Sequence, residues 1–354
     1  MLGLSRYTLH ALAFVMPVFN LMFWVTAPHV QPLWWALPLL MVIGADFWAG
    51  PDRRQPEAHD AEWVFDLVLW GLSAIQLLNV AGLAWLVSGT GLFSLEAAVG
   101  IFIIGAGSGY SAIVVAHELV HRPQNRYRQL GRLLLSTVLY EHFATEHVRG
   151  HHKRVATGDD PATARYGEHF WPFFFRTVPG QFRSAWALEL KRLKRPNLPW
   201  HAWAQRHNRV AQGVVMGWGL LLLVAVTLGP DAALAHLLQA FWAVLLLESV
   251  NFIEHWGLQR YGKRVGTIDS WDSESWLTLY TLVGLSRHAD HHAHAARPYS
   301  DLRWFDESPK MPWGYYATAI TAIVYDAAVR RRMDAELRRK ELGPYSVQAA
   351  RAAK

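Results

Sequence analysis

Six long apolar blocks dominate the first 255 residues of the chain. They cover residues 8–26, 32–49, 63–87, 93–117, 210–229 and 232–253. Each block is long enough, or nearly so, to cross about 30 Å of hydrocarbon as a helix. Only helices and closed barrels satisfy their backbone polar groups inside a bilayer. The sequence therefore predicts an all-α integral membrane protein with six transmembrane helices, the first of them retained because no small-residue cleavage site follows it.

Lysine and arginine fall on alternate sides of the predicted membrane. The turns near residues 28–32, 88–95 and 229–233 contain neither residue, whereas the segment 118–209 and the tail 258–354 are rich in both. Positively charged loops stay in the cytoplasm. We therefore expect cytoplasmic termini, a bacterial inner (plasma) membrane location, and a cytoplasmic helical metal-binding cap formed by the insertion and the tail. We treat residues 1–354 as one integrated domain.

Nine histidines are clustered with the spacing of metal ligands. They are His117, His121, His147, His151, His152, His255, His288, His291 and His292. Imidazole suits iron, zinc and copper. Nine ligands are too many for one ion, so the pattern indicates a two-metal centre. All nine histidines lie on the predicted cytoplasmic side.

Helical spacing distinguishes the clusters. His117 and His121 stand at i and i+4 on one helix face, and with Glu118 they also form the H-E-x-x-H pattern of zinc proteases. Adjacent residues on a helix point about 100° apart, so His151 and His152 are able to serve different ions. His255 lies on the polar stripe of an otherwise apolar helix, where polar groups are expensive and usually functional.

Several carboxylates and one amide lie next to these histidines. A ligating imidazole usually donates its other N–H to such a group, which fixes the ring. One of the carboxylates is also able to ligate a metal directly, and the spacing does not choose. The candidates are Glu118, Glu146, Asp160, Asn251, Glu254 and Asp290.

The chain has no cysteine and a formal net charge of +6. Thiolate-ligated iron–sulfur clusters and a cysteine nucleophile are therefore excluded, so a redox centre must receive electrons from another protein. The positive charge fits anionic membrane lipid or an acidic partner protein, and we expect no nucleic acid. The glycine-rich segment 105–109 lies inside an apolar block without a preceding strand, which favours helix packing or room for a ligand over nucleotide binding.

Together the histidine motifs resemble those of the membrane-bound alkane hydroxylase and xylene monooxygenase family, integral-membrane histidine-box enzymes of the desaturase-like superfamily. The matching segments are HELVHR at 117–122, EHVRGHH at 146–152, NFIEHWGL at 251–258 and LSRHADHH at 285–292. The stretches at 154–165 and 297–315 also resemble the hydroxylase branch. The resemblance covers most of the chain after residue 110.

The resemblance implies a non-haem di-iron centre, two Fe ions held by the nine histidines, without a flavin in this chain. It implies O₂-dependent hydroxylation of a terminal methyl or another unactivated C–H bond of an apolar substrate. Electrons would come from NAD(P)H through a reductase and a rubredoxin or ferredoxin. Family substrates include alkanes and alkyl-substituted aromatics.

One segment departs from the family pattern. Alkane hydroxylases tend to carry an asparagine-rich stretch where this chain reads SWDSES at 270–275, which leaves a methyl-aromatic or terpenoid substrate open. The alternatives to a hydroxylase are a desaturase-type di-iron enzyme and, more remotely, an intramembrane zinc protease. A metal transporter would need charged residues or histidines in several membrane helices, and the first three blocks contain few.

Overall fold

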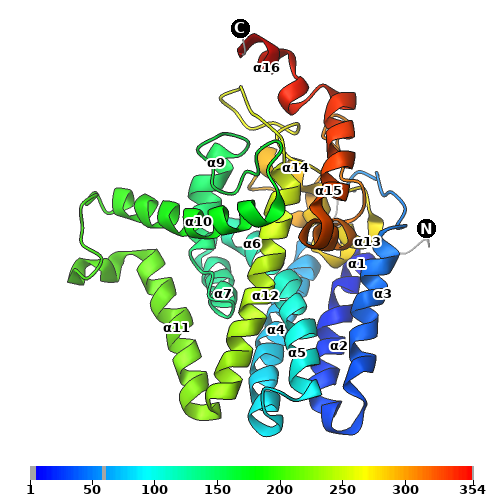
Figure 1. Cartoon of the computed structure of the whole chain (residues 1–354). Helices are drawn as coiled ribbons and strands as arrows, with labels where there is room; N and C mark the ends of the chain where they lie inside the picture. Colours follow the sequence, from blue (N-terminus) through cyan, green and yellow to red (C-terminus); the bar gives the residue numbers. More distant parts are fainter. Residues whose placement is uncertain (1–4, 58–60, 353–354) are drawn as a thin grey trace.

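The structure is a computed structural model that describes residues 5–57 and 61–352. These residues are helical apart from loops and two isolated β-bridges, at Pro51–Ser275 and Asp272–Lys310. Long helices pack side by side as a bundle, and the other helices gather mainly at one end of that bundle as a cap (Figure 1). The predicted all-helical architecture is confirmed for the described residues.

Five helical segments of the described chain are long and apolar enough to cross a membrane. They are Arg6–Thr26 (α1, η1 and α2), Glu62–Thr90 (α4), Leu95–His121 (α5, η4 and α6), Arg209–Leu228 (α11) and Pro230–His255 (α12). The predicted block at 32–49 folds as a 3₁₀ turn, Pro32–Ala36, followed by α3, Leu37–Asp46. This apolar helix is shorter than the other five, because Pro32 and Pro38 delay its regular start.

Two of the long helical segments consist of several shorter elements. The first helical segment consists of α1 (Arg6–His10), η1 (Ala11–Phe14) and α2 (Val15–Thr26), followed by η2 (Ala27–His29). The third long segment consists of α5 (Leu95–Gly107), the π-helical turn η4 (Ser108–Ile113) and α6 (Val114–His121). π-Helical turns inside α-helices are frequent at functional sites, and this one immediately precedes the helix that carries His117.

The glycine-rich segment serves close helix packing, one of the two functions predicted for it. A Cβ atom on Gly105 would lie 2.8 Å from Cδ1 of Trp242, and one on Gly109 would lie 3.2 Å from Cδ1 of Leu246. Both partners belong to α12, so the missing side chains let α5 and η4 approach that helix.

The cap contains the segments after His121 and after His255. Its elements are α7 (Asn125–Ser136), α8 (Phe143–Glu146), η5 (His147–His151), α9 (His152–Arg154), α10 (Phe170–Arg192), η6 (Trp203–His207), α13 (Trp276–Thr281), η7 (Leu285–Arg287), α14 (His288–Ala293), η8 (Tyr299–Asp301), α15 (Tyr315–Lys340), η9 (Gly343–Tyr345) and α16 (Val347–Ala352).

Part of the 118–209 segment packs against the long helices. Helix α7 packs along α6, and the amide of Gln239 on α12 donates a hydrogen bond to the carbonyl of Thr137, just after α7. Gln239 lies near the middle of α12, so the 118–209 segment is not confined to the outer end of the bundle (Figure 1). The charge pattern alone did not indicate this return.

Candidate metal centre

The structure brings all nine clustered histidines together at the junction of the long helices and the cap. They form two groups, and within each group one nitrogen from every ring lies within 4.8 Å of the others. The first group contains His117, His121, His147, His152 and His291, and the second contains His151, His255, His288 and His292. Ligand nitrogens about 2 Å from an ion stand up to about 4 Å apart, so nitrogens within 4.8 Å of one another are close to the spacing of the ligands of one metal ion.

Five elements position these rings. Helix α6 presents His117 and His121 from one face, and α12 ends at His255. The π-helical turn η5 carries His147 and His151, α9 begins at His152, and α14 carries His288, His291 and His292. His151 and His152 belong to different groups because consecutive helical residues diverge in direction.

Many of the ring nitrogens are buried without a hydrogen-bond partner. They include Nε2 of His117, His121, His151 and His288 and both ring nitrogens of His255 and His292. Buried polar atoms in folded proteins are almost always satisfied. A cluster of orphaned imidazole nitrogens therefore fits the coordination of metal ions, which would occupy their lone pairs.

Burial also favours the protonation state that metal binding requires. It lowers the pKa of His147 and His291 well below the usual range, and neighbouring imidazoles add to the shift. The same causes lower the pKa of His152, His288 and His292. These rings are therefore neutral at pH 7 and offer a free lone pair.

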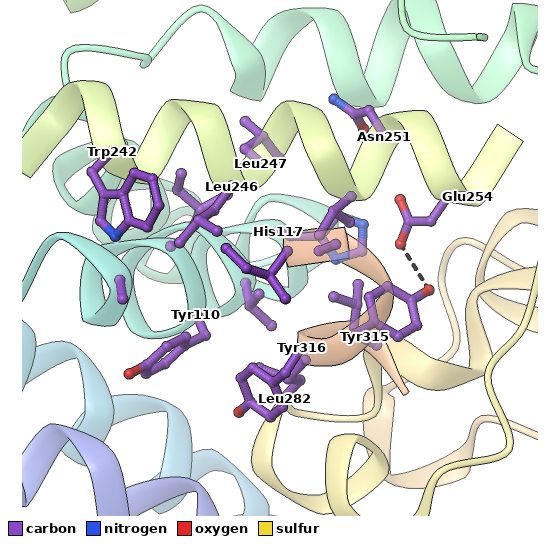
Figure 2. Close-up of a pocket in the computed structure, with 18 of the residues that line it drawn as sticks. Tyr110, His117, Trp242, Leu246, Leu247, Asn251, Glu254, Leu282, Tyr315 and Tyr316 are labelled. Carbon is purple, nitrogen blue, oxygen red and sulfur yellow. Dashed lines mark hydrogen bonds between the residues drawn. The ribbon is translucent and has the colours of Figure 1, made fainter. Parts of the chain in front are cut away.

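Asp160 and Glu254 contact histidines of the second group. Oδ2 of Asp160 lies 2.8 Å from Nδ1 of His151, and Oε1 of Glu254 lies 3.2 Å from Nδ1 of His288. Burial alone would raise the pKa of Asp160, but His151 and the hydroxyl of Thr163 hold this pKa below its usual value. The phenol of Tyr315 donates a 2.9 Å hydrogen bond to Glu254 (Figure 2).

The other candidate neighbours contact different groups. Glu118 accepts from Arg122 at 2.8 Å, and Glu146 accepts from Arg154 at 2.5 Å. Asn251 donates to Glu248 at 3.0 Å, and Asp290 accepts from Arg297 and His294. These contacts thus stabilise the cap and the helices that carry the histidines.

Asp272 is a buried residue that the motif analysis did not select. Its Oδ1 accepts the backbone N–H of Ala289 at 2.7 Å, and its Oδ2 accepts the hydroxyl of Ser308 at 2.7 Å. The carboxylate therefore fixes the first turn of α14. Asp272 lies in the 270–275 segment that departs from the family pattern. Its position after the NFIEHWGL segment was the one sequence feature that could have indicated a function for it.

An apolar cavity of about 220 Å³ ends at the histidines. At that end it is lined by His117, His147 and His288, which come from both groups. Farther from the histidines the cavity is lined by Trp242 and Leu246 of α12 and by the glycine-rich segment of α5 and η4. Figure 2 shows His117 and Glu254 at one end of the cavity and Trp242 at the other. Small-molecule sites are commonly such largely apolar cavities with few polar groups.

The chain matches the fatty acid desaturase family over residues 93–319. Alkane 1-monooxygenase 1 of Pseudomonas aeruginosa is 33% identical over 92% of this chain and 89% of its own length. Alkane 1-monooxygenase 2 of Alcanivorax borkumensis is 35% identical over 79% of this chain and 75% of its own. The xylene/toluene monooxygenase hydroxylase component XylM of Pseudomonas putida is 26% identical over 58% of this chain and 55% of its own.

The chain belongs to the integral-membrane fatty acid desaturase family. Within that family it is a monooxygenase similar to the alkane 1-monooxygenases, as the resemblance implied. The histidine groups fit a non-haem iron centre, and an enzyme of this kind needs an apolar substrate and an electron-transfer partner. These relatives favour a hydroxylase over the desaturase and zinc-protease alternatives.

Proposed function

We propose that this protein hydroxylates a terminal methyl or another unactivated C–H bond of an apolar substrate at a centre of two iron ions. The observation that carries the proposal is the apolar cavity that reaches His117, His147 and His288, and thereby both histidine groups. The overall reaction combines substrate, O₂, two electrons and two protons to give an alcohol and water.

The five-histidine group would hold one iron and the four-histidine group the other. Iron at these positions would supply the activation of O₂ that an unactivated C–H bond requires. Asp160 would orient His151 by accepting its Nδ1–H, which leaves Nε2 for the metal. Glu254 would likewise accept the Nδ1–H of His288, while the phenol of Tyr315 holds the Glu254 carboxylate in place.

The cavity wall would select and orient the substrate. Leu246, Leu247 and Val250 line one side of the cavity and Ile113 and Val114 line another, so a hydrocarbon is stabilised by burial whereas a charged molecule is not. Such a substrate dissolves in the bilayer and reaches a cavity among membrane helices without an aqueous step. Alkanes, alkyl-substituted aromatics and terpenoids all fit this chemistry.

The topology supports delivery of electrons from the cytoplasm. We propose six spans with α3 as the short second one, cytoplasmic termini, and a bacterial inner-membrane location, because the basic segments share one side with the histidines. The partner would be a rubredoxin or ferredoxin reduced by an NAD(P)H-dependent reductase. The absence of cysteine in the chain supports an external iron–sulfur donor.

The experiment that tests this function is turnover under ¹⁸O₂ with a reduced donor protein. A panel of n-alkanes, alkyl aromatics and terpenes is supplied, and the products are identified by mass spectrometry. We expect an alcohol that contains one ¹⁸O atom. An alkene without incorporated oxygen would instead indicate a desaturase.

A further inference from the structure

A second cavity lies away from the metal centre, between α10, α11 and the turn at residues 139–142. Its volume is about 460 Å³, and none of the nine clustered histidines lines it. Val178 and Phe182 of α10 and Val214 and Trp218 of α11 form much of its wall. Trp218 and Val214 are among the exposed apolar side chains of a candidate membrane span, so the cavity borders the lipid-facing surface.

His142 lines this cavity and carries an unsatisfied ring nitrogen. The residue is only 7% exposed, and its Nε2 is buried without a hydrogen-bond partner. The rings of Tyr140 and Phe182 pack against it, with centroids 4.2 Å and 5.3 Å away. Because burial lowers the pKa of His142 to about 3, the imidazole is neutral and offers one N–H donor and one acceptor. An orphaned nitrogen on a cavity wall calls for a ligand atom.

The charge of the cavity comes from Arg183. This exposed side chain lines the cavity and makes no ion pair or side-chain hydrogen bond with the described residues. Glu141 also lines the cavity, but it is ion-paired with Arg132 behind it. The cavity therefore presents an unneutralised cation to an incoming ligand.

Helix α10 has the orientation and the surface of a helix that lies on a membrane. It runs across the ends of the long helices rather than along them (Figure 1). Its exposed face includes Trp171, Phe175 and Phe182, of which Phe175 is 69% exposed. Aromatic side chains on one face of an in-plane helix bury themselves at the boundary of head groups and acyl chains. The cavity beneath α10 is thus at the depth of a lipid head group and the start of its chains.

We propose that this cavity binds one phospholipid of the surrounding membrane. Arg183 contacts the phosphate, the N–H of His142 donates to a phosphate or ester oxygen, and an acyl chain packs along Val214 and Trp218. Arg183 favours a lipid of net negative charge over a zwitterionic one. The site does not depend on the oxygenase chemistry, so this proposal and the proposed function succeed or fail separately.

The location gives the lipid a structural role. His142 immediately precedes α8, which leads directly into the π-helical turn that carries His147 and His151. A lipid held between α10 and α11 would brace this segment.

The test is lipid binding to the delipidated, iron-loaded enzyme in neutral detergent. Dioleoylphosphatidylglycerol and dioleoylphosphatidylcholine are titrated separately, and bound molecules are counted by native mass spectrometry. The variants are Arg183→Gln, His142→Phe and Val214→Trp, the last of which fills the cavity without changing a charge. Lys191→Gln is the matched control, because Lys191 is an exposed cation of the same helix that does not line the cavity.

We expect one phosphatidylglycerol to bind more tightly than phosphatidylcholine. In Arg183→Gln, loss of a charge-assisted phosphate contact should weaken the binding of phosphatidylglycerol by roughly tenfold. Val214→Trp should weaken the binding of both lipids, whereas Lys191→Gln should bind them as the wild type does. A phosphatidylglycerol carrying a photoreactive diazirine in its acyl chain should label α11 near Trp218. Unchanged binding in both Arg183→Gln and Val214→Trp would overturn the proposal. So would displacement of the lipid by n-decane, which would assign the cavity to apolar substrate.

Discussion

Oδ2 of Asp160 lies 2.8 Å from Nδ1 of His151, and both side chains are buried. This contact leaves Nε2 of His151 directed to the second histidine group. Asp160 itself is held by the hydroxyl of Thr163 at 2.6 Å. In the proposed metal centre the carboxylate would therefore determine the orientation and the tautomer of the His151 ring without belonging to the ring cluster.

Asp160→Asn should weaken metal binding while the fold is kept. An asparagine of the same shape does not hold the imidazole N–H as a carboxylate does, and loss of such a partner typically costs about 10–100-fold in metal affinity or activity. Iron per chain and turnover are the measurements. Asp159→Asn is the control, since Asp159 is the exposed neighbour. Equal iron content in the two variants would show that Asp160 does not orient a ligand.

Removal of single ligands should release iron. His151→Ala and His288→Ala each delete a proposed ligand of the four-histidine group, so we expect the iron content to fall from the proposed two ions per chain to one or fewer. Metal analysis by inductively coupled plasma mass spectrometry checks this result. His201→Ala, which changes an exposed histidine outside the clusters, should retain both ions. One zinc and no iron in the wild type would refute the di-iron proposal.

Filling the apolar cavity should shorten the range of accepted substrates. Leu246 lines the cavity across from Gly109, so Leu246→Trp should occupy the space between the histidines and Trp242. One methylene in such a pocket is worth about 10-fold or more in selectivity, and the ratio of turnover for long to short substrates should fall by about that factor. Iron content should stay the same.

The matched control for this change lies on a different helix. Leu222→Trp places an equal side chain on the 64% exposed position of α11. It should leave the substrate profile unchanged. If both variants shift the profile alike, the cavity is not the substrate site.

Acid should destabilise the protein partly through His142. Its folded-state pKa of about 3 lies below the unfolded value of 6.5, so the unfolded chain binds the extra proton between these values. The stability from this group is complete above pH 6.5 and is lost as the pH falls toward 3. Between pH 7 and pH 5 the loss amounts to about 2 kcal/mol.

The comparison with His142→Phe isolates that contribution. Phenylalanine fits the aromatic surroundings of Tyr140 and Phe182 and does not titrate. The thermal midpoint of the His142→Phe variant should therefore fall less than that of the wild type when the pH is lowered from 7 to 5. Parallel declines in the two proteins would contradict the assigned cause.

Local patterns were sufficient to predict the helices and the ligand candidates. The apolar blocks at 63–87 and 210–229 coincide with α4 and α11 within a few residues, because hydrophobic length is a property of the chain alone. The i, i+4 spacing of His117 and His121 likewise follows from one helix. The short α3 was overestimated in length, since its prolines delay the regular helix.

Only the tertiary structure decided how the histidines divide and what surrounds them. Membership in a group depends on where α6, η5, α9, α12 and α14 meet, and these elements are separated by up to about 170 residues of sequence. The same is true of Asp272 beneath α14 and of the apolar cavity, because both arise from contacts between distant segments. The sequence by itself determined a helical membrane protein with nine candidate metal ligands, and packing decided which of them face one another and which apolar cavity reaches them.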